Sequence, residues 1–412
     1  MEHWSAVPSR LPDGAAAPAD GALPSDALRE LGRRPFGIYV HVPFCATRCG
    51  YCDFTTYTAE ELGPGVSRAA YADTALLELR LARHVLGERA PRVDTVFFGG
   101  GTPTLLPAGH LAAVLREVDE LFGLSAGVEV TTEANPESVA PGYLARLREA
   151  GFTRISLGMQ SAAPHVLRVL DRTHTPGRAV QAVAEARRAG FDHVNLDLIY
   201  GTPGETEADW QGSLDTAVDA GPDHLSAYAL VVEEGTALAR RVRRGELPEP
   251  DDDVLADRYA QADETLSRRG FGWYEVSNWA RGTAARSRHN RLYWTGGDWW
   301  GVGPGAHSHV GGVRWWNVRH PGPYAARLHA GGSPAAGREV LGAGARRMEH
   351  TMLGLRLREG LSVRDLSVRG RDAASRAVTY GLLDRRSHDE GRAVLTLRGR
   401  LLADAVVRDL VD

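Results

Sequence analysis

The chain has 412 residues, of which 43% are hydrophobic and 24% charged, and its formal net charge is −4 at pH 7. This composition is that of a globular protein of about two or three domains, and it gives no whole-chain signal for binding nucleic acid or an anionic membrane. All 48 basic residues are arginine, which excludes a Walker lysine or a lysine Schiff base, and no apolar run approaches the roughly 18 residues of a membrane-spanning helix.

The first segment, residues 1–33, is rich in Ala, Pro, Gly and Asp and shows neither an apolar period nor an Arg-rich amphipathic pattern. We expect it to be a mostly disordered lead-in. It also lacks the pattern of a secretory signal, so we expect a cytoplasmic protein.

Three cysteines, Cys45, Cys49 and Cys52, are the only ones in the chain, and they follow a strand-like apolar run at 36–42. Thiolates are the ligands that iron-sulfur clusters require, and ferredoxin-type carriers use four of them for each cluster. The spacing C-x3-C-x2-C therefore leaves one iron without a cysteine. This pattern predicts a reactive cluster whose open iron binds a substrate.

Two other interpretations of the cysteines are open at this point. A structural zinc ion would need a fourth protein ligand, and His41 is near in sequence, although it lies on the preceding strand. A disulfide bond with one free thiol is disfavoured in a reducing cytosol. The remaining sequence motifs are needed to choose among a cluster, a zinc site and a disulfide bond.

Strand and helix patterns alternate through the first half of the chain. Strands are expected at 36–42, 93–98, 128–132, 153–157, 193–199 and 224–231. Helices are expected at 66–86, 108–121, 138–150 and 207–218, with two short helices before residue 190. Six such units predict an α/β fold, a partial (β/α)6 barrel at 34–235 that is open on one side. Functional groups in such folds gather where the strands end at their carboxyl side.

Several conspicuous residues obey that rule. The cysteines follow the first strand, Gly99–Gly101 the second, Glu133 the third and Gln160 the fourth, while Asp197 lies late in the fifth. A glycine run lets the backbone approach a ligand closely, although such a turn alone is weak support. Each polar residue alone is more often a surface or capping residue. Together with Arg172 they could hold an amino group, a ribose and a carboxylate.

The chain resembles the radical S-adenosylmethionine superfamily, in the branch that contains the oxygen-independent coproporphyrinogen dehydrogenases and the HemW haem chaperones. The resemblance runs from about residue 36 to the C-terminus. It is carried by the motifs YVHVPFCATRCGYCDF, FFGGGTPT, TTEANPES, RISLGMQS, LDRTH and NLDLIYGTPGET, in this order.

This resemblance implies a set of cofactor sites. Cys45, Cys49 and Cys52 would hold a 4Fe-4S cluster, whose open iron chelates the amine and carboxylate of S-adenosylmethionine. The other implied cofactor-binding residues are Tyr39 and Tyr51 for adenosine, Gly100, Gly101 and Thr102 for the methionine amino end, and Glu133, Gln160, Arg172 and Asp197 for the remainder. Arg172 suits a carboxylate because its planar fork donates two hydrogen bonds at once. A reduced cluster can pass one electron to the sulfonium, so the protein is able in principle to cleave S-adenosylmethionine.

Two features favour the HemW side of this branch. The dehydrogenases resemble C-x3-C-x2-C-x-C, whereas Cys52 is followed here by Asp53 and Phe54, as in HemW. The segment HNRLYW matches the HNxxYW motif associated with haem, which implies haem-binding residues His289, Asn290, Tyr293 and Trp294. Imidazole is a natural axial ligand of haem iron, and aromatic side chains suit a flat macrocycle. The alternative is a structural linker whose histidine bonds the backbone.

The second half of the chain is expected to hold two further regions. Residues 236–339 would be a linker or extension with the haem motif, and its GVGPGAHS segment, from Gly301 to Ser308, is expected to be a tight turn of open role. Residues 340–412 would be a winged-helix-like α+β domain, with helices at 347–358, 362–368, 372–380 and 398–410 and a hairpin turning at 389–391. It shows no basic stripe, so we expect a cover or docking surface and no nucleic acid.

We therefore predict a haem chaperone of the HemW type, which binds a 4Fe-4S cluster, S-adenosylmethionine and haem and delivers haem to acceptor haemoproteins, including membrane-associated ones. It would also need an electron donor for the cluster. The alternative is an oxygen-independent coproporphyrinogen dehydrogenase, an oxidative decarboxylase. Radical methyltransferases share the cluster motif, but we know no reason for them to carry HNRLYW.

Overall fold

The computed structural model describes residues 14–62 and 67–411. Its centre is one twelve-stranded sheet in the order β12-β11-β10-β9-β1-β2-β3-β4-β5-β6-β8-β7. The six central strands run parallel to one another and are β1 (Phe36–Val42), β2 (Val93–Gly100), β3 (Leu124–Ala134), β4 (Arg154–Gln160), β5 (His193–Tyr200) and β6 (His224–Ala229). The helices between them are α2 (Arg68–Leu86), α3 (Ala108–Phe122), α4 (Pro141–Glu149), α5 (Pro164–Val169), α6 (Arg178–Arg188) and α7 (Glu207–Asp219).

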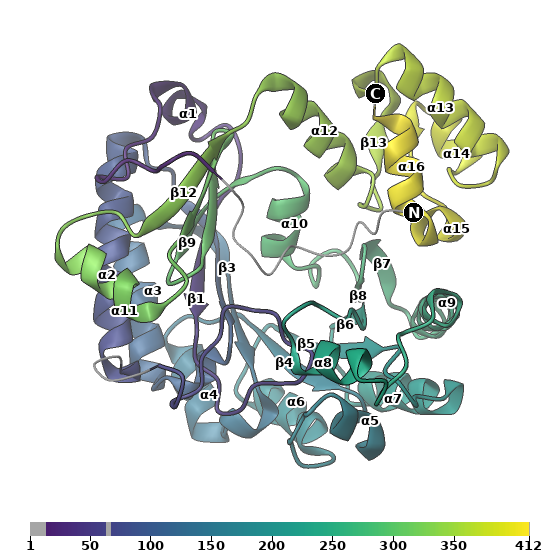
Figure 1. Cartoon of the computed structure of the whole chain (residues 1–412), viewed down its shortest axis with the longest axis horizontal. Helices are drawn as coiled ribbons and strands as arrows, with labels where there is room; N and C mark the ends of the chain where they lie inside the picture. Colours follow the sequence, from purple (N-terminus) through teal and green to yellow (C-terminus); the bar gives the residue numbers. More distant parts are fainter. Residues whose placement is uncertain (1–13, 63–66, 412) are drawn as a thin grey trace.

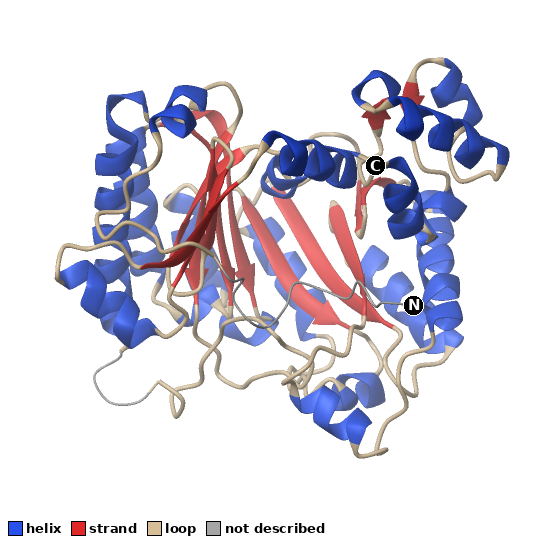
Figure 2. Ribbon diagram, turned by 45° about the horizontal axis from the view of Figure 1, so that its top comes forward, coloured by secondary structure: helices blue, strands red, loops and turns tan. Residues whose placement is uncertain are grey.

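The predicted partial (β/α)6 barrel is confirmed. β1 pairs with β2 and β9, whereas β6 pairs with β5 and β8, so the sheet does not close on itself. Figures 1 and 2 show a strongly twisted sheet with helices outside it, and in Figure 2 the arrowheads of the central strands lie at the lower edge, where the loops gather.

The alternation of side chains along β1 explains how the barrel has two different faces. Ile38, Val40 and Val42 are fully buried in the main hydrophobic core. Because successive side chains of a strand point to opposite faces, Tyr39 and His41 lie on the other, concave face. One face of the strand therefore packs in the apolar core, and the other lines the inside of the barrel with polar and aromatic groups.

The region expected as a linker or extension builds both edges of this sheet. At one edge β8 (Asn278–Ala280) and β7 (Gly272–Glu275) follow β6 in antiparallel pairing. At the other edge stand β9 (Asp298–Val302), β10 (His307–Val310), β11 (Val313–Asn317) and β12 (Ala335–Val340). Gly311 and Gly312 both have positive φ in the turn between β10 and β11. A Gly-Gly pair between β-branched and aromatic runs is a hairpin signal that would have revealed these strands.

Helix α10 (Arg288–Trp294), which contains the HNRLYW motif, lies against the concave face of β1. A Cβ atom added at Gly37 would lie 3.1 Å from Leu292 Cδ1 and 3.3 Å from His289 Cε1. Figure 1 shows this helix between the strands of β1 and the β7–β8 pair. The other helices of the region are α8 (Ala237–Arg243), α9 (Asp252–Arg268) and α11 (Pro321–His329).

The C-terminal region has a hydrophobic cluster of its own and stands at the upper right in Figure 1. Its elements are α12 (Ala343–Gly354), β13 (Leu361–Ser362), α13 (Val368–Thr379), α14 (Arg385–Asp389), β14 (Arg392–Ala393), α15 (Leu397–Leu401) and α16 (Ala403–Leu410). Helices with a small sheet were expected, and an antiparallel bridge joins Leu383 to Leu395 around the expected turn. The tight hairpin at 389–391 is wrong, because α14 lies between the bridged residues and β14 pairs with β13. Asp384 instead accepts a hydrogen bond from Ser387 N at 2.8 Å and starts helix α14. The expected helix at 362–368 is also wrong, because only a 3₁₀ turn forms there, at Val363–Asp365.

Residues 14–33 are ordered, so the expectation of disorder is wrong for this part, and residues 1–13 lie outside the described residues. Ala15 and Arg338 exchange two backbone hydrogen bonds of 2.9 and 2.8 Å, and α1 (Ser25–Glu30) follows. This segment therefore packs on β12. In the described part of the chain, no helix is long and apolar enough to cross a membrane.

Candidate cofactor site

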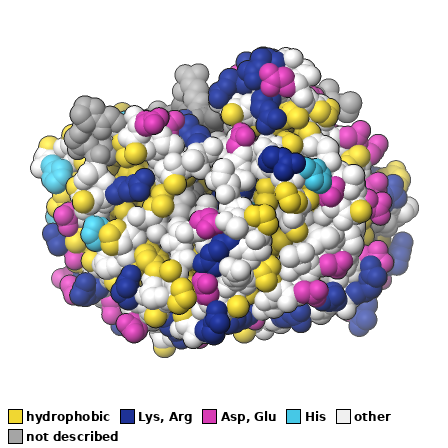
Figure 3. Space-filling model, turned by 90° about the horizontal axis from the view of Figure 1, so that it is seen from below, with side chains coloured by type: hydrophobic (Ala, Val, Ile, Leu, Met, Phe, Trp, Pro, Cys, Tyr) yellow, Lys and Arg dark blue, Asp and Glu magenta, His cyan; other side chains and the backbone are white. Residues whose placement is uncertain are grey.

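A pocket of about 620 Å³ opens at the carboxyl ends of the central strands. Figure 3, which views the molecule from below, shows a hollow in the middle of this face, with acidic and basic side chains beside it. The predicted site residues that line it are Cys45, Cys49, Tyr51, Cys52, Gly100, Gly101, Thr102, Glu133, Gln160, Arg172 and Asp197. Tyr39 and the four HNRLYW residues lie elsewhere.

Backbone hydrogen bonds join the start of the cysteine loop to the segment that follows the loop and to the end of β2. Cys45 N donates to Tyr57 O at 3.0 Å, and Thr102 N donates to Phe44 O at 2.7 Å. A Cβ atom at Gly101 would lie 2.5 Å from Phe44 O and 3.0 Å from Cys45 Sγ. The glycine run therefore lets the second strand end lie directly against the first cysteine, which is the close approach expected from the sequence.

The chemistry of this loop fits an iron-sulfur cluster. Burial raises the pKa of Cys45, and raises that of Cys52 to about 11, so both thiols keep their protons until iron displaces them. In the described part of the chain, no three His, Cys, Asp or Glu side chains are placed to hold one metal ion, whereas a cubane cluster takes each thiolate on a different iron.

Arg172 reaches into the cysteine loop. Its Nη1 donates to Cys49 Sγ at 3.4 Å and its Nη2 to Gly158 O at 3.0 Å. Its buried Nε has no hydrogen-bond partner among the described residues. A buried guanidinium with a free donor beside three thiols suits an anionic cluster and an anionic ligand.

His41 is not available as a metal ligand. Its Nε2 lies 2.8 Å from Thr55 O, and because a carbonyl only accepts, Nε2 carries the proton. Its Nδ1 therefore accepts from Tyr39 OH at 2.9 Å. Burial lowers the pKa of His41 to about 4, so the ring is neutral. His41 thus fastens the segment after Cys52 to β1, and the zinc interpretation loses its fourth ligand.

Two buried carboxyl groups lie at the ends of β3 and β5. Burial raises the pKa of Glu133 to about 8, and the charge of Asp197 adds to this rise. Glu133 Oε2 accepts from Gly100 N at 3.1 Å. Asp197 accepts from Ser156 Oγ at 2.6 Å and from Asn195 Nδ2 at 2.8 Å. Both carboxyl groups line the pocket, and Glu133, whose donor here is the Gly100 N–H, can accept a further hydrogen bond from an amino or hydroxyl group of a ligand.

Backbone strain marks Gln160 and its neighbourhood. Among the described residues, Gln160 and Asp171 are the non-glycine residues with positive φ, at 65° and 51°. Such strain costs energy and persists at functional sites. Tyr228 and Glu233 are among the pocket residues that sequence reasoning missed. Tyr228 lies late in β6, so the strand-end rule could have found it.

His289 and Leu292 of the HNRLYW motif are buried, and the His289 ring is enclosed by side chains of the sheet and of its own helix. His289 Nδ1 lies 2.8 Å from Thr95 Oγ1, and His289 Nε2 lies 2.8 Å from Tyr293 OH. Its ring stacks on Phe97 with centroids 5.1 Å apart. Burial lowers the pKa of His289 to about 3. Both ring nitrogens are in use, so in this conformation His289 has no free lone pair for an iron atom.

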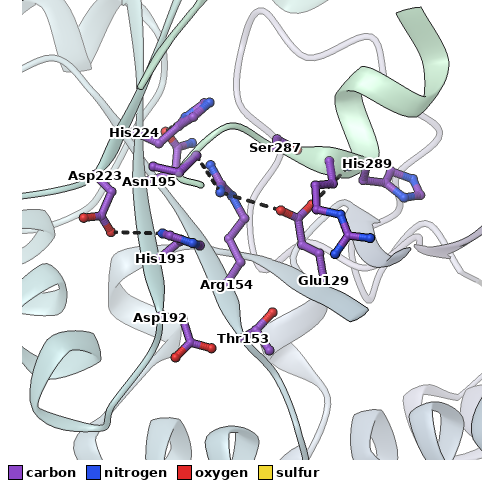
Figure 4. Close-up of polar contacts among 12 residues, drawn as sticks. Glu129, Thr153, Arg154, Asp192, His193, Asn195, Asp223, His224, Ser287 and His289 are labelled. Atoms are coloured by element: carbon purple, nitrogen blue, oxygen red, sulfur yellow. Dashed lines mark hydrogen bonds and ion pairs between the residues drawn. The ribbon is translucent and has the colours of Figure 1, made fainter. Parts of the chain in front are cut away.

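Further polar contacts hold α10 in place (Figure 4). His289 N donates to Glu129 Oε1 at 3.0 Å, and Glu129 forms a buried ion pair of 3.8 Å with Arg154. Burial raises the pKa of Glu275 to about 7, and hydrogen bonds from Asn290 and Trp294 oppose that rise. All four motif residues are therefore bonded within the protein, although the His289 ring bonds two side chains and not the backbone that the linker interpretation expected.

Comparisons with known proteins agree with the geometry. A model of the radical SAM superfamily matches residues 39–217. The haem chaperone HemW of Mycobacterium tuberculosis strain H37Rv is 57% identical over 93% of this chain and 97% of its own. HemW of Bacillus subtilis strain 168 is 30% identical over 89% and 97%. The solved structure of the radical SAM enzyme coproporphyrinogen III oxidase (HemN) of Escherichia coli superposes with a TM-score of 0.80 over 96% of both chains, at 22% identity, which shows a shared fold.

Proposed function

The chain belongs to the HemW family of the radical S-adenosylmethionine superfamily, and from this premise we propose that it is a haem chaperone, which takes up haem and delivers it to acceptor haemoproteins. The observation that carries the proposal is the 57% identity, over 93% of this chain, to a protein named haem chaperone HemW. An electron donor for the cluster, membrane-associated haem acceptors and a cytoplasmic location belong to the same proposal.

In this proposal the pocket holds a 4Fe-4S cluster and S-adenosylmethionine. Cys45, Cys49 and Cys52 would hold the cluster, which when bound supplies an electron for cleavage of a carbon-sulfur bond of S-adenosylmethionine. Arg172 would donate hydrogen bonds to the cofactor carboxylate, and Glu133 would accept from its amino group. The other proposed cofactor residues are Tyr51, Gly100, Gly101, Thr102, Gln160 and Asp197.

The coproporphyrinogen dehydrogenase alternative is not favoured. The fold likeness to HemN carries only 22% identity, and the position two residues after Cys52, where those enzymes have another cysteine, holds Phe54. The Phe54 side chain is 60% exposed at the edge of the pocket. An exposed phenylalanine there offers an apolar surface and cannot ligate iron.

The test combines both activities on one preparation. The full chain would be reconstituted anaerobically with iron and sulfide, titrated with haem and followed by its Soret absorption, and assayed for 5′-deoxyadenosine and for coproporphyrinogen conversion. A chaperone should bind haem tightly and leave coproporphyrinogen unchanged. Failure to take up haem would reject the proposal, and formation of protoporphyrinogen would favour the alternative.

A further inference from the structure

The proposed function needs a histidine or other group that can reach haem iron, and His289 has no free nitrogen. The concave face beside α10 offers a different histidine. Trp299 of β9 faces this side, because its ring meets Tyr293 of α10 with centroids 4.6 Å apart. His309 lies opposite Trp299 in the neighbouring strand, with the rings 5.2 Å apart. Since side chains alternate along a strand, His307 shares this face.

His307 is exposed, although the residues on both sides of it are buried. In the described part of the chain its imidazole takes part in no hydrogen bond, and the contact it makes is through its carbonyl, which accepts from Trp299 Nε1 at 2.9 Å. Partial burial and the nearby Arg319 and Arg314 guanidinium groups lower the pKa of His307. The ring is therefore neutral at pH 7, with a lone pair available, which is the form that ligates metals.

The glycines of the GVGPGAHS turn bring His307 up to the cysteine loop. A Cβ atom at Gly305 would lie 2.9 Å from the side chain of Thr55, which follows Cys52 by three positions, and one at Gly303 would lie 2.4 Å from His41 O. Side chains at these two positions would push the turn away. The turn thus places an exposed imidazole on the concave face, beside the segment that follows the cysteines.

The surroundings of His307 suit a flat, apolar ligand that carries carboxylates. The buried Trp316 lies beside its ring, with centroids 5.9 Å apart and planes 31° apart, so the half-buried Trp299 is the indole that offers an aromatic face on this side. Arg319 forms no ion pair among the described residues, and its Nε is buried without a hydrogen-bond partner. An unpaired guanidinium is the group that a propionate would bind.

We propose that His307 is the axial ligand through which this protein holds haem iron, with Trp299 beside the macrocycle and Arg319 paired with a propionate. This assignment rests on the proposed haem-chaperone function. In this assignment the HNRLYW motif shapes the haem site. His289 and Tyr293 hold α10 against the sheet, and the ring of Tyr293 packs on Trp299. The iron then binds next to the motif and not on it.

The test is ferric haem titration of the full chain carrying its cluster, followed by Soret difference spectra and by the spin state in electron paramagnetic resonance. We expect His307→Ala to weaken haem binding at least tenfold and to change the spin state, and added imidazole to restore the wild-type Soret band. His307→Tyr should bind haem with the spectrum of an oxygen ligand. Arg319→Gln should weaken binding several-fold without moving the Soret band.

The matched control is His329→Ala, an exposed histidine at the end of α11, which should bind haem as the wild type does. Wild-type affinity and spectrum in both His307 variants would overturn the inference and leave the chaperone function standing. If His289→Ala lost the spectrum of an axial histidine while the His307 variants kept it, the inference would also be overturned and the chaperone function would stand. A wild-type protein that takes up no haem would reject the proposed function, and this assignment with it.

Discussion

The backbone N–H of Gly303 donates to Glu78 Oε2 at 2.8 Å, across 225 positions of the sequence. Glu78, on α2, also accepts from Asn317 Nδ2 at 2.7 Å and from Tyr324 OH. One buried carboxyl group therefore joins the outer helix layer, the GVGPGAHS turn and β11. The position of the turn, and with it that of His307, depends on this contact.

The protonation of Glu78 predicts how stability changes with pH. Burial raises the pKa of Glu78 from 4.5 to about 7, so between these values the folded protein holds a proton that the unfolded chain has lost. Stability from this group is fully present below pH 4.5 and falls by up to about 3 kcal/mol as pH rises to 7. Urea unfolding at pH 5 and pH 7.5 should show a smaller difference for Glu78→Gln than for the wild type. The exposed Glu60→Gln serves as the control, and an equal difference in all three proteins would contradict this expectation.

Gly101→Ala should prevent assembly of the cluster without unfolding the sheet. The new methyl group would lie 2.5 Å from Phe44 O and 3.0 Å from Cys45 Sγ, so the cysteine loop has to move away from the strand end. Iron and sulfide content for each chain after reconstitution should fall sharply, with an unchanged far-ultraviolet circular dichroism spectrum. Gly109→Ala is the matched control, because nothing lies within 4 Å of its added Cβ and alanine favours its helix by about 1 kcal/mol. Normal iron content in Gly101→Ala would refute the proposed packing.

His289→Ala should destabilise the whole protein. It removes a ring packed on Phe97 and leaves Thr95 and Tyr293 without their buried partner, which costs about 2–4 kcal/mol. Urea unfolding monitored by tryptophan fluorescence measures this loss. His329→Ala, on the surface, should change stability by less than about 0.5 kcal/mol. A stable His289→Ala protein that has lost haem would instead point to direct ligation.

Arg172→Gln should lower the reduction potential of the assembled cluster and weaken binding of S-adenosylmethionine. The guanidinium donates to Cys49 Sγ, and both its charge and its hydrogen bond favour the extra electron of the reduced cluster. A redox titration followed by electron paramagnetic resonance gives the potential, and calorimetry gives the cofactor affinity. The exposed Arg168→Gln on the preceding helix α5 is the control. Unchanged values for Arg172→Gln would show that this contact has no influence on the cluster.

The sequence predicts the central sheet closely, and the reason is local. The run at 36–42 is apolar and β-branched and ends at Pro43, and the structure has β1 at Phe36–Val42. The polar residues of the pocket could be predicted because each one follows a strand, and parallel strands end at one edge. Neighbouring residues and the general rule for a parallel sheet are enough to predict both features.

The role of α10 could not be predicted in the same way. His289 bonds to Thr95 across 194 positions, and no pattern near residue 289 shows that its ring is enclosed. The motif identifies these residues, but it does not show whether their side chains are buried or exposed. For the same reason the free imidazole of His307 becomes visible only when β9, β10 and α10 are seen together.

The ordered segment before β1 has a practical consequence for work on this protein. Ala15 covers backbone groups of β12, the last strand on that side of the sheet, and a sheet margin with unpaired amides and carbonyls recruits strands from other molecules. A version trimmed to residue 34 for crystallisation would leave that margin bare, and its solubility would be expected to suffer before its cofactor chemistry did.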